Sequence, residues 1–493
     1  MRSRSTSRGR ETLRAAAVFA VGIGCLGGAM LIAQKPFGQP QPRADRLAPI
    51  SVPTRGRTVM LPKPEGVAPG APAGFEVTSY AELQAPRMMV YAPNGDLFVS
   101  SPAANNITVL RDANHDGVFE ARSVFAQGET PRAAGPPPAA SNAQSGARRG
   151  LPGPGDLAAA GAPPPPPPAP SPQSVNPAIN GPILGASAPP CTPPPSFQAS
   201  GPGVLAAPFG MAFHGGYLYV GNTGSIVRYK YTSGDLQAQA APEKLMDLPM
   251  GGHSTRNIIF NRAGTKMYVT VGSDSNNNAG EDCRRAAVLE FNPDGSGYRV
   301  YASGIRNPVG LTLQPGTDTI WVAINERDNL GDDLVPDYAT SVKDGGFYGW
   351  PYSYIGQNYD PRYVGAFPDL VKRAIVPDVL IPAHSAALGM AFYTAARFPQ
   401  KYRNGAFVAL HGSWNRGVAA GYKVGFFPMI DGKPGPLEDF VTGFLVSDGS
   451  NNTTIERWGR PVGVTVTPDG GLLISDDGSN RIWKVSAAGS RRP

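Results

Sequence analysis

Cysteine, charge and helical periodicity are all scarce in this chain of 493 residues. Three cysteines occur, and only Cys283 lies in sequence that can build a folded body. The sequence therefore excludes a disulfide framework and leaves open a single bridge to Cys191. Charged residues make up 16% of the chain, whereas glycine (61) and proline (53) are abundant. Apolar residues rarely recur at a helical spacing, so the composition favours an all-β protein rich in turns.

The positive charge is confined to the N-terminus. Residues 1–60 contain ten Lys or Arg and two acidic residues, so the net charge of +7 leaves the remaining 433 residues at −1. A body without a basic stripe gives no reason to expect nucleic acid as a partner. Arginines in residues 1–14 precede an apolar run, 15–33, which is typical of an export signal and nearly long enough to span a bilayer. We therefore expect residues 1–33 to be a cleaved signal peptide or a retained membrane anchor, and the body to be periplasmic or otherwise exported.

Two further segments are too rich in proline to form a core. Residues 34–73 are expected to be a Pro-rich tether, and residues 131–203, which hold 22 of the 53 prolines, a solvated low-complexity insertion. The insertion is either a spacer or a docking segment. Residues 74–486 then form the folded body, followed by a tail at 487–493.

An internal repeat runs through that body. Each copy has an apolar strand, a turn with glycine and a second strand, as in MMVYAPNGDLFVSS from Met88 and VGVTVTPDGGLLISDD from Val462. The turn glycines of the six copies are Gly95, Gly216, Gly264, Gly316, Gly405 and Gly470. Once the insertion is removed, the shorter intervals lie near 50 residues, the period of a β-propeller blade. The sequence predicts an all-β, six-bladed β-propeller.

One stretch, residues 325–351, fits neither a helix nor a strand period. It carries acidic residues early and glycines and aromatics late (NERDNLGDDLVPDYATSVKDGGFYGWP). We expect a long loop leaving the end of a strand, and loops of this length are usually functional or disordered. Its aromatic content argues against disorder, so it marks the candidate active face.

Several side chains stand at the edges of the repeats and can converge on that face. His253 precedes the third copy and can act as a general base near neutral pH, although a structural histidine is the simpler interpretation. Arg306 and Asn307 open the fourth copy, where an arginine fork suits a carboxylate or a bridge between blades. Trp414, Arg416 and Arg460 lie at the edges of the fifth and sixth copies. Together with Arg457 and Trp458, they predict a site for a flat, polyanionic molecule.

The motifs GSDSNNNAGED, GIRNP, NERDNLGDDLVPDY, GGFYGWP and HGSWNR, in this order, resemble the glucose/sorbosone dehydrogenase family and its L-sorbosone dehydrogenase-like branch. The resemblance covers residues 74–485 apart from the insertion. It implies a six-bladed propeller that uses pyrroloquinoline quinone (PQQ) with Ca²⁺. It also implies a small sugar or aldehyde substrate and a separate electron acceptor.

The resemblance also assigns roles to individual residues. His253 matches the catalytic histidine, and Arg306, Asn307 and Arg460 match residues that contact PQQ. The backbone carbonyls of Arg327 and Asp328 match the calcium-binding turn, where related enzymes commonly have Gly-Pro. Asp332 matches an acid beside that turn. In HGSWNR the cofactor-binding position is filled by either Arg416 or Asn415, next to Trp414.

The sequence therefore predicts an exported PQQ- and Ca²⁺-dependent oxidoreductase that oxidises an aldose or a sugar-derived, sorbosone-like aldehyde by hydride transfer, with a histidine base. Two alternatives stay open. One is a non-catalytic propeller that binds a protein or a glycan on the same face, and the other is a metal-dependent propeller lactonase.

Overall fold

A computed structural model describes residues 41–114, 117, 119–129 and 201–489. The predicted signal or anchor, nearly all of the Pro-rich insertion and the end of the tail lie outside these residues. Within the described part of the chain, no helix is long and apolar enough to cross a membrane.

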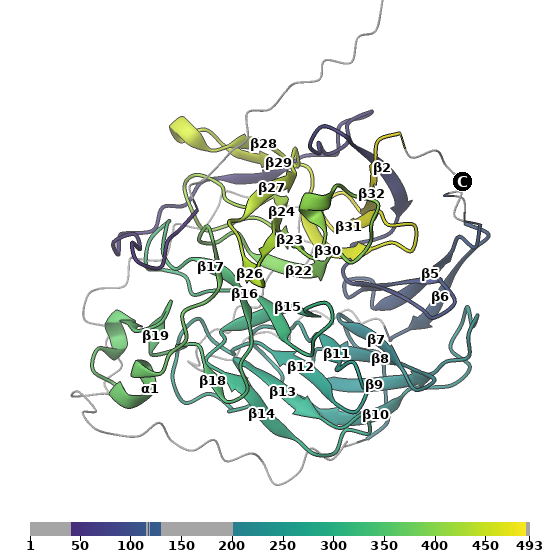
Figure 1. Ribbon diagram of the computed structural model, residues 1–493, viewed down its shortest axis with the longest axis horizontal. Coiled ribbons are helices and arrows are strands. Elements are labelled where there is room, and N and C mark those ends of the chain that lie inside the picture. Colours follow the sequence, from purple (N-terminus) through teal and green to yellow (C-terminus); the bar gives the residue numbers. More distant parts are fainter. Residues whose placement is uncertain (1–40, 115–116, 118, 130–200, 490–493) are drawn as a thin grey trace, which may run out of the picture. The chain divides into compact units, whose positions relative to one another are not determined.

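The protein is all-β, and six of its sheets contain a run of four antiparallel strands (Figure 1). The first two of these sheets are β3 (Met89–Tyr91), β4 (Leu97–Ser101), β5 (Asn106–Arg111), β6 (Ala121–Gln127) and β7 (Met211–His214), β8 (Tyr217–Asn222), β9 (Ser225–Lys230), β10 (Glu243–Asp247). The next two are β11 (Ile258–Phe260), β12 (Met267–Val271), β13 (Ala287–Phe291), β14 (Arg299–Ser303) and β15 (Asn307–Leu313), β16 (Ile320–Asn325), β17 (Asp337–Ser341), β21 (Val379–Ile381). The last two are β22 (Ala387–Phe392), β23 (Ala406–Leu410), β24 (Lys423–Phe427), β27 (Glu438–Val441) and β30 (Pro461–Val466), β31 (Leu472–Asp476), β32 (Arg481–Ala487), β2 (Phe75–Glu82).

The remaining elements extend one of these sheets or lie in the segments that connect them. Strand β18 (Gly346–Phe347) joins β14 in parallel, and a separate sheet has the order β1 (Thr58–Met60), β29 (Ile455–Arg457), β28 (Leu445–Asp448). Two small hairpins are β19 (Ser353–Tyr354) with β20 (Asn358–Tyr359) and β25 (Met429–Ile430) with β26 (Lys433–Pro434). The one α-helix among the described residues is α1 (Pro368–Lys372), and short 3-10 turns occur at Pro361–Tyr363, Gln400–Tyr402 and Ser450–Asn452.

The predicted repeats correspond to the first two strands of each of the six sheets. In every copy the two strands pair antiparallel across the predicted turn. Five of the six turn glycines have a positive φ, between 68° and 92°. Glycine adopts a positive φ easily because it has no Cβ to clash with the backbone. In the fifth copy Asn404 takes this conformation instead, with φ 61°.

The two ends of the described body meet in the last sheet. Strand β2, near the start, pairs antiparallel with β32, near the end, and Figure 1 shows the purple and yellow strands side by side. The sheet that starts with β30 is therefore completed by the N-terminal strand, which joins the two ends of the body without a covalent bond.

The prediction of one long loop over residues 325–351 is partly wrong. Residues 326–336 are irregular, but Asp337–Ser341 form β17, which pairs with β16. All five residues of β17 are buried. A strand buried on both faces shows no alternation of polar and apolar residues, so its period was not visible in the sequence.

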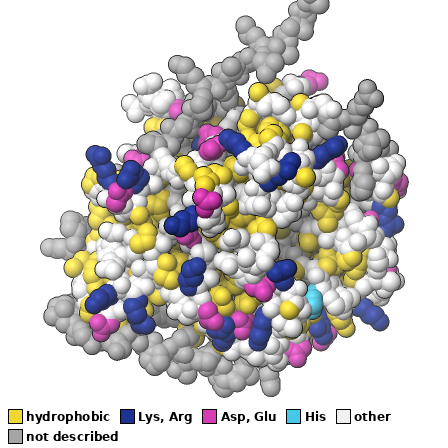
Figure 2. Space-filling model, in the orientation of Figure 1, with side chains coloured by type: hydrophobic (Ala, Val, Ile, Leu, Met, Phe, Trp, Pro, Cys, Tyr) yellow, Lys and Arg dark blue, Asp and Glu magenta, His cyan; other side chains and the backbone are white. Residues whose placement is uncertain are grey.

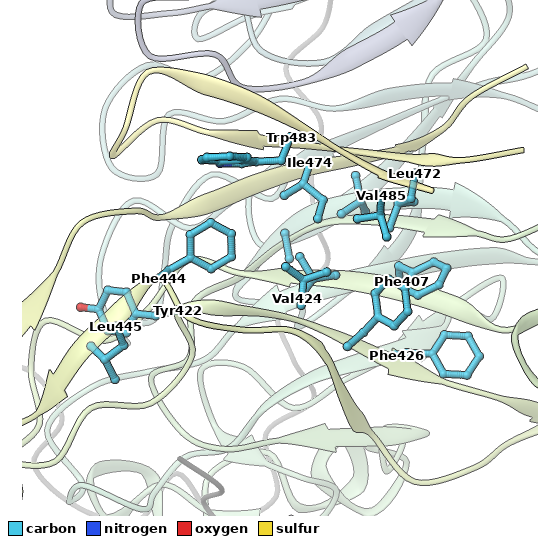
Figure 3. Packing of buried hydrophobic residues seen from close by; sticks show 14 of the residues in the cluster. Phe407, Tyr422, Val424, Phe426, Phe444, Leu445, Leu472, Ile474, Trp483 and Val485 are labelled. Carbon is cyan, nitrogen blue, oxygen red and sulfur yellow. The ribbon is translucent and has the colours of Figure 1, made fainter. Parts of the chain in front are cut away.

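The hydrophobic core is divided into clusters that lie between consecutive sheets. Figure 3 shows one of them, where Phe407 and Val424 of one sheet face Leu472, Ile474 and Val485 of the next. Equivalent clusters join the other neighbours, including the β31–β32 region with the β3–β5 region. Each fully buried Val, Leu or Phe contributes about 1.5–3 kcal/mol, so the sheets are stabilised mainly by stacking on their neighbours.

The first strands of the sheets form a closed cycle of contacts. Strand β3 contacts β7, β7 contacts β11, β11 contacts β15, β15 contacts β22, β22 contacts β30, and β30 contacts β3. Between them lies a small apolar cluster that contains Phe209, Val309, Leu388 and Val462, with Met88 packed against it. The equivalent positions of the repeats thus meet at a common, apolar centre.

The only cysteine among the described residues, Cys283, is disulfide-bonded.

Candidate active site

The candidate site lies at one end of the sheets. In each antiparallel hairpin, the residues before the first strand and those after the second strand lie at the same end. His253, Arg306 and Arg460 precede first strands, whereas Asp328 and His411 follow second strands. This topology gathers residues far apart in the sequence, and their contacts form the two clusters described next.

His253 is held in a defined tautomer. Its backbone N–H donates to the carbonyl of Ser273 at 3.0 Å, and its Nδ1 lies 2.9 Å from the same carbonyl oxygen. A carbonyl can only accept, so Nδ1 carries the proton and Nε2 is left as the basic nitrogen. Burial, followed by the positive charge of Arg306, lowers the pKa of His253 to about 3. The neutral imidazole is therefore the form present near neutral pH.

Arg306 is buried and uses its guanidinium to fix the surrounding loops. Nε donates to the Asn276 carbonyl at 2.9 Å, and Nη1 donates to the Glu326 carbonyl at 2.6 Å. Nη2 donates to Asn276 Oδ1 at 3.0 Å and lies 3.6 Å from Asp328 Oδ2. The adjacent Asn307 has a buried Oδ1 with no hydrogen-bond partner among the described residues. A Cβ added at Gly272 would contact both this oxygen and His253, so Asn307 lies beside the histidine.

The Asp328 side chain links this loop to two further segments. Its Oδ1 accepts from Asn415 Nδ2 at 2.6 Å and lies 3.3 Å from His384 Nδ1. Burial acts to raise the pKa of Asp328, but the hydrogen bond of His384 and the charge of Arg306 lower it overall. His384 is itself held through Nε2, 2.9 Å from the Gly331 carbonyl oxygen. We call His253, Arg306, Asn307, Asp328 and His384 the histidine cluster.

A second group of charges surrounds Asp477, which follows β31. Asp477 accepts from Arg87 at 2.8 Å and from His411 Nε2 at 2.9 Å. Burial and then the charge of Arg460 lower the pKa of His411 to about 4, although Asp477 acts in the opposite direction. Burial also lowers the pKa of Arg460, and the like charges of Arg457 and Arg87 act in the same direction. We call Arg87, His411, Arg457, Arg460 and Asp477 the arginine cluster.

The two clusters are neighbours. The backbone N–H of His411 donates to the Ala386 carbonyl at 3.0 Å, two residues after His384, and that of Gly412 donates to Ser385. Arg460 Nε and Nη2 each lie 3.3 Å from a carbonyl oxygen of the His411–Gly412 turn. Arg457 lies over the Tyr422 ring, and its Nε and Nη1 are buried without a hydrogen-bond partner among the described residues. The arginine cluster therefore retains unused donors beside the histidine cluster.

Three predicted cofactor residues make other contacts. Asp332 accepts from the Thr54 backbone N–H at 2.7 Å, from the Thr54 hydroxyl, and from the Gly417 N–H at 2.9 Å. Trp414 is 55% exposed, with the Arg55 guanidinium 5.5 Å from its ring centre. Arg416 is buried and donates to Asp333 at 2.8 Å. Of the two candidates in HGSWNR, Asn415 is the one that contacts Asp328. The cofactor roles of Asp332, Trp414 and Arg416 stay predictions.

The predicted calcium turn is rigidly held. The Arg327 side chain is fully buried, 3.0 Å from Glu326 and 3.1 Å from Asp360, and donates to the Ser353 carbonyl at 2.7 Å. The Arg327 side chain therefore fixes the turn from the protein interior. Only the backbone carbonyl of Arg327 can serve in the predicted metal role, because the side chain is used in these bonds. The Asp328 carbonyl already accepts from Asn276 Nδ2 at 3.1 Å. The described residues contain no group of three or more His, Cys, Asp or Glu that could hold a metal.

Sequence reasoning did not identify Arg87, His384 or Asp477. In the first and last sheets, Arg87 and Asp477 occupy edge positions like those of Arg306 and Asp328. An alignment of the six repeats with one another would therefore have pointed to both residues. His384 lies in an irregular segment with φ 64°, and no sequence pattern marks it.

Comparison with known proteins supports the predicted class. The PQQ domain of pyranose dehydrogenase from Coprinopsis cinerea superposes with a TM-score of 0.59 at 19% identity, covering 86% of this chain and 98% of that one. The likeness establishes the fold and agrees with the predicted β-propeller. An Escherichia coli protein, aldose sugar dehydrogenase, is 24% identical over 287 residues, which cover 54% of this chain and 70% of the relative.

Residues 221–413 match the family model for glucose/sorbosone dehydrogenase, and residues 371–488 match a TrAA12-like model. The predicted resemblance to the glucose/sorbosone dehydrogenase family is thus confirmed. An uncharacterised protein of Borreliella burgdorferi is 33% identical over 240 residues; the match spans 47% of this chain and 60% of that relative.

Proposed function

We propose that this chain is a PQQ- and Ca²⁺-dependent oxidoreductase that oxidises an aldose or a sorbosone-like aldehyde, with His253 as the general base. One observation carries the proposal. A histidine with its Nδ1 proton fixed on Ser273 and its Nε2 left basic lies beside a cluster of arginines with unused donors. The first part suits proton removal, and the second suits a flat anion.

The six sheets that contain a run of four antiparallel strands are then six blades of one propeller. The closed cycle of contacts among the first strands, the core cluster between each pair of neighbouring sheets, and the pairing of β2 with β32 support this arrangement. In such a fold, the loops at one end of the central axis provide a single shared site, which is where both clusters lie.

The residues of the arginine cluster fit PQQ, a planar quinone that carries several carboxylates. Arg87, Arg457 and Arg460 bring three positive charges against the one carboxylate of Asp477, and Arg457 has two buried nitrogens without hydrogen-bond partners among the described residues. An arginine fork binds a carboxylate through two parallel hydrogen bonds. The unpartnered Oδ1 atoms of Asn307 and Asn415 are further polar groups that a ligand would satisfy.

The 326–328 turn fits a hard cation. Ca²⁺ prefers oxygen ligands, including backbone carbonyls and carboxylates. The carbonyls of Arg327 and Asp328 would hold the ion, and the ionised Asp328 side chain, 25% exposed, supplies negative charge in the same turn. The buried ion pairs of Arg327 keep the turn in place.

The chemistry of the protein's own residues follows from these positions. His253 Nε2 removes the hydroxyl proton of an aldose CH–OH group or of an aldehyde hydrate, while its Nδ1–H bond to Ser273 keeps the imidazole oriented. When bound, PQQ supplies the two-electron acceptor for the hydride of the carbon that bears this hydroxyl, and Ca²⁺ supplies a Lewis acid. The substrate thereby loses one proton and one hydride and gains a carbonyl. A separate acceptor then removes the two electrons.

Reconstitution of the full chain tests this proposal. The protein is titrated with PQQ with and without Ca²⁺, and dye-linked oxidation is measured with a panel of aldoses and sugar-derived aldehydes. We expect a protein-bound quinone spectrum and Ca²⁺-dependent dye reduction. The enzymatic proposal fails if bound PQQ supports oxidation of no aldose or aldehyde. A protein that does not bind PQQ at all would instead be the non-catalytic, glycan- or protein-binding alternative.

The lactonase alternative is less well supported, because a lactonase metal is held by several side-chain carboxylates or amides. The part of the chain that the structure describes offers no cluster of three acidic, histidine or cysteine residues for this purpose. Lactone hydrolysis without PQQ would favour that alternative.

We also propose that the enzyme acts outside the cytoplasm, attached to the membrane if residues 1–33 are retained. The support is the arginine-flanked apolar run in the sequence. Figure 2 shows acidic and basic side chains interspersed on the visible face.

A further inference from the structure

A segment near the N-terminus crosses the loops of the candidate site. Residues 47–61, which we call the strap, were predicted to be part of a tether. Leu47 packs against the cluster that contains Leu330, Leu334 and Val335. Further along, strand β1 pairs in parallel with β29. The strap therefore contacts segments some 270–400 residues away in the sequence.

The first set of contacts is with the acidic loop. The Ser51 N–H donates to the Leu330 carbonyl at 3.0 Å. Thr54 donates to Asp332 twice, through its backbone N–H at 2.7 Å and through its hydroxyl. The same carboxylate accepts from the Gly417 N–H at 2.9 Å. Asp332 thus joins the loop that carries Asp328 directly to the loop that carries Asn415, and Thr54 donates to the same carboxylate.

The second set of contacts is with the arginine loops. The Gly56 N–H donates to the Arg416 carbonyl at 3.1 Å. A Cβ at Gly56 would lie 2.8 Å from both the Gly417 carbonyl oxygen and Ile455, so the backbones approach as closely as only glycine allows. The pairing of β1 with β29 ends at Met60 opposite Arg457, and the Leu61 N–H donates to the Arg457 carbonyl at 2.7 Å.

We propose that the strap is a positioning element of the site, with Thr54 and Gly56 setting the spacing between the Asp328 loop, the Asn415 loop and the strand that carries Arg457. The Asp328 and Asn415 loops are also bonded directly, through Asn415–Asp328, Arg416–Asp333 and Gly417–Asp332. The strap contacts these two loops and also the strand that carries Arg457, so it is the segment that contacts all three. The choice of PQQ as the ligand rests on the proposed function. The mechanical role of the strap does not.

The test uses the full chain with Thr54→Val, which keeps the shape of the side chain and the backbone donor but removes the hydroxyl donor to Asp332. Thr54→Ser retains the hydroxyl and serves as the rescue. Asp45→Asn is the matched control, because the Arg43–Asp45 ion pair is exposed and precedes the strap. Hydrogen–deuterium exchange of peptides covering 325–333 and 411–417 is measured without cofactor, and the Kd for PQQ is measured with Ca²⁺.

In Thr54→Val, exchange in both loops should rise about threefold to tenfold and the Kd for PQQ should rise by a similar factor, since a hydrogen bond to a charged group is lost. Gly56→Ala should act in the same direction more strongly. Thr54→Ser and Asp45→Asn should match the wild type. Faster exchange confined to the strap would overturn the proposal, as would loosened loops that leave the Kd unchanged. If the wild type binds no PQQ, the proposed function fails, and the exchange data alone decide on the strap.

Discussion

The two clusters of the candidate site differ in how their arginines are used. In the histidine cluster, the donors of Arg306 are directed at Asn276, Asn325, Glu326 and Asp328, all within the protein. In the arginine cluster, Arg457 keeps two buried nitrogens unpartnered among the described residues, and Arg460 makes only long contacts of 3.3 Å to carbonyls. The donors of Arg306 are thus bonded within the protein, whereas Arg457 has donors without partners and Arg460 makes only long hydrogen bonds.

This difference separates two tasks. A guanidinium that is fully bonded within the protein holds geometry, and here it holds the loops around His253. Burial, followed by the charge of this guanidinium, lowers the pKa of His253 and keeps the imidazole neutral. The two buried nitrogens of Arg457 that lack partners among the described residues are costly, because buried polar groups normally find partners. A bound anion would remove that cost. We therefore propose that the histidine cluster determines turnover and the arginine cluster determines the affinity for the cofactor.

The sharpest way to break this comparison is His253→Gln. Glutamine can keep a donor toward Ser273 but has no basic nitrogen. We expect kcat to fall by a factor of about 10²–10⁴, the usual contribution of a general base, with the Kd for PQQ changed less than about threefold. Steady-state dye reduction and PQQ titration of the same preparation measure both quantities.

His214→Gln is the matched control for this variant, because His214 stacks on Phe260 with ring centres 4.4 Å apart, near the turn at the other end of the hairpins. It should keep the wild-type kcat. A His253→Gln protein that turns over at the wild-type rate would remove the general-base role and leave the site as a binding site.

The opposite result is expected for Arg460→Gln. The change removes one positive charge from the arginine cluster and leaves His253 and its partners intact. The Kd for PQQ should rise about 10- to 100-fold, as expected for losing a charge-assisted carboxylate contact, while kcat at saturating PQQ falls much less. Titrations at two salt concentrations also test whether the charge is responsible.

Arg262→Gln serves as the control, since Arg262 lies in the turn between β11 and β12 and donates to the Gly316 carbonyl at 2.9 Å at an exposed position. Equal Kd values for Arg460→Gln and Arg262→Gln would mean that the arginine cluster is an internal ion-pair network without a ligand.

The sequence was sufficient for the parts of the fold that depend on local pattern. Alternating strands and a glycine turn predict each hairpin, and hairpin geometry places His253, Arg306 and Arg460 at one end. The sequence was insufficient where a site residue is held by a residue from another sheet. Nothing near Asp328 in the sequence indicates that His384 and Asn415 hold its carboxylate.

Two other failures have physical reasons as well. Strand β17 is buried on both faces, so the alternation that reveals a strand is missing. The strap was assigned to a tether because it lies within a longer segment, 34–73, that contains many prolines and arginines. It is bound mainly through its backbone, and backbone hydrogen bonds leave little trace in side-chain chemistry. Asp332 was noticed for its charge, whereas its contacts in the structure are with Thr54 and Gly417.

The smallest expected effect is on the pH dependence of the free energy of unfolding, to which His253 of one cluster and His411 of the other both contribute. The folded pKa of His253 is about 3 and that of His411 about 4, both below the value of about 6.5 for an unfolded histidine. As the pH falls from about 6.5 towards 4, the unfolded chain binds protons that the folded chain does not, so each histidine lowers the free energy of unfolding. Asp337, whose pKa burial raises to about 7, acts in the opposite direction, because its folded carboxyl holds a proton that the unfolded one releases.

Urea unfolding at pH 7.5 and pH 5.0 separates these contributions. Between these values the wild type should lose roughly 1–2 kcal/mol for each histidine, offset in part by Asp337. His253→Gln and His411→Gln should each lose less stability on acidification than the wild type, and Asp337→Asn should lose more. If His253→Gln and the wild type had the same pH dependence, His253 would titrate alike in the folded and unfolded states. The lowered pKa inferred for His253 in the histidine cluster would then be wrong, although the arginine cluster would be unaffected.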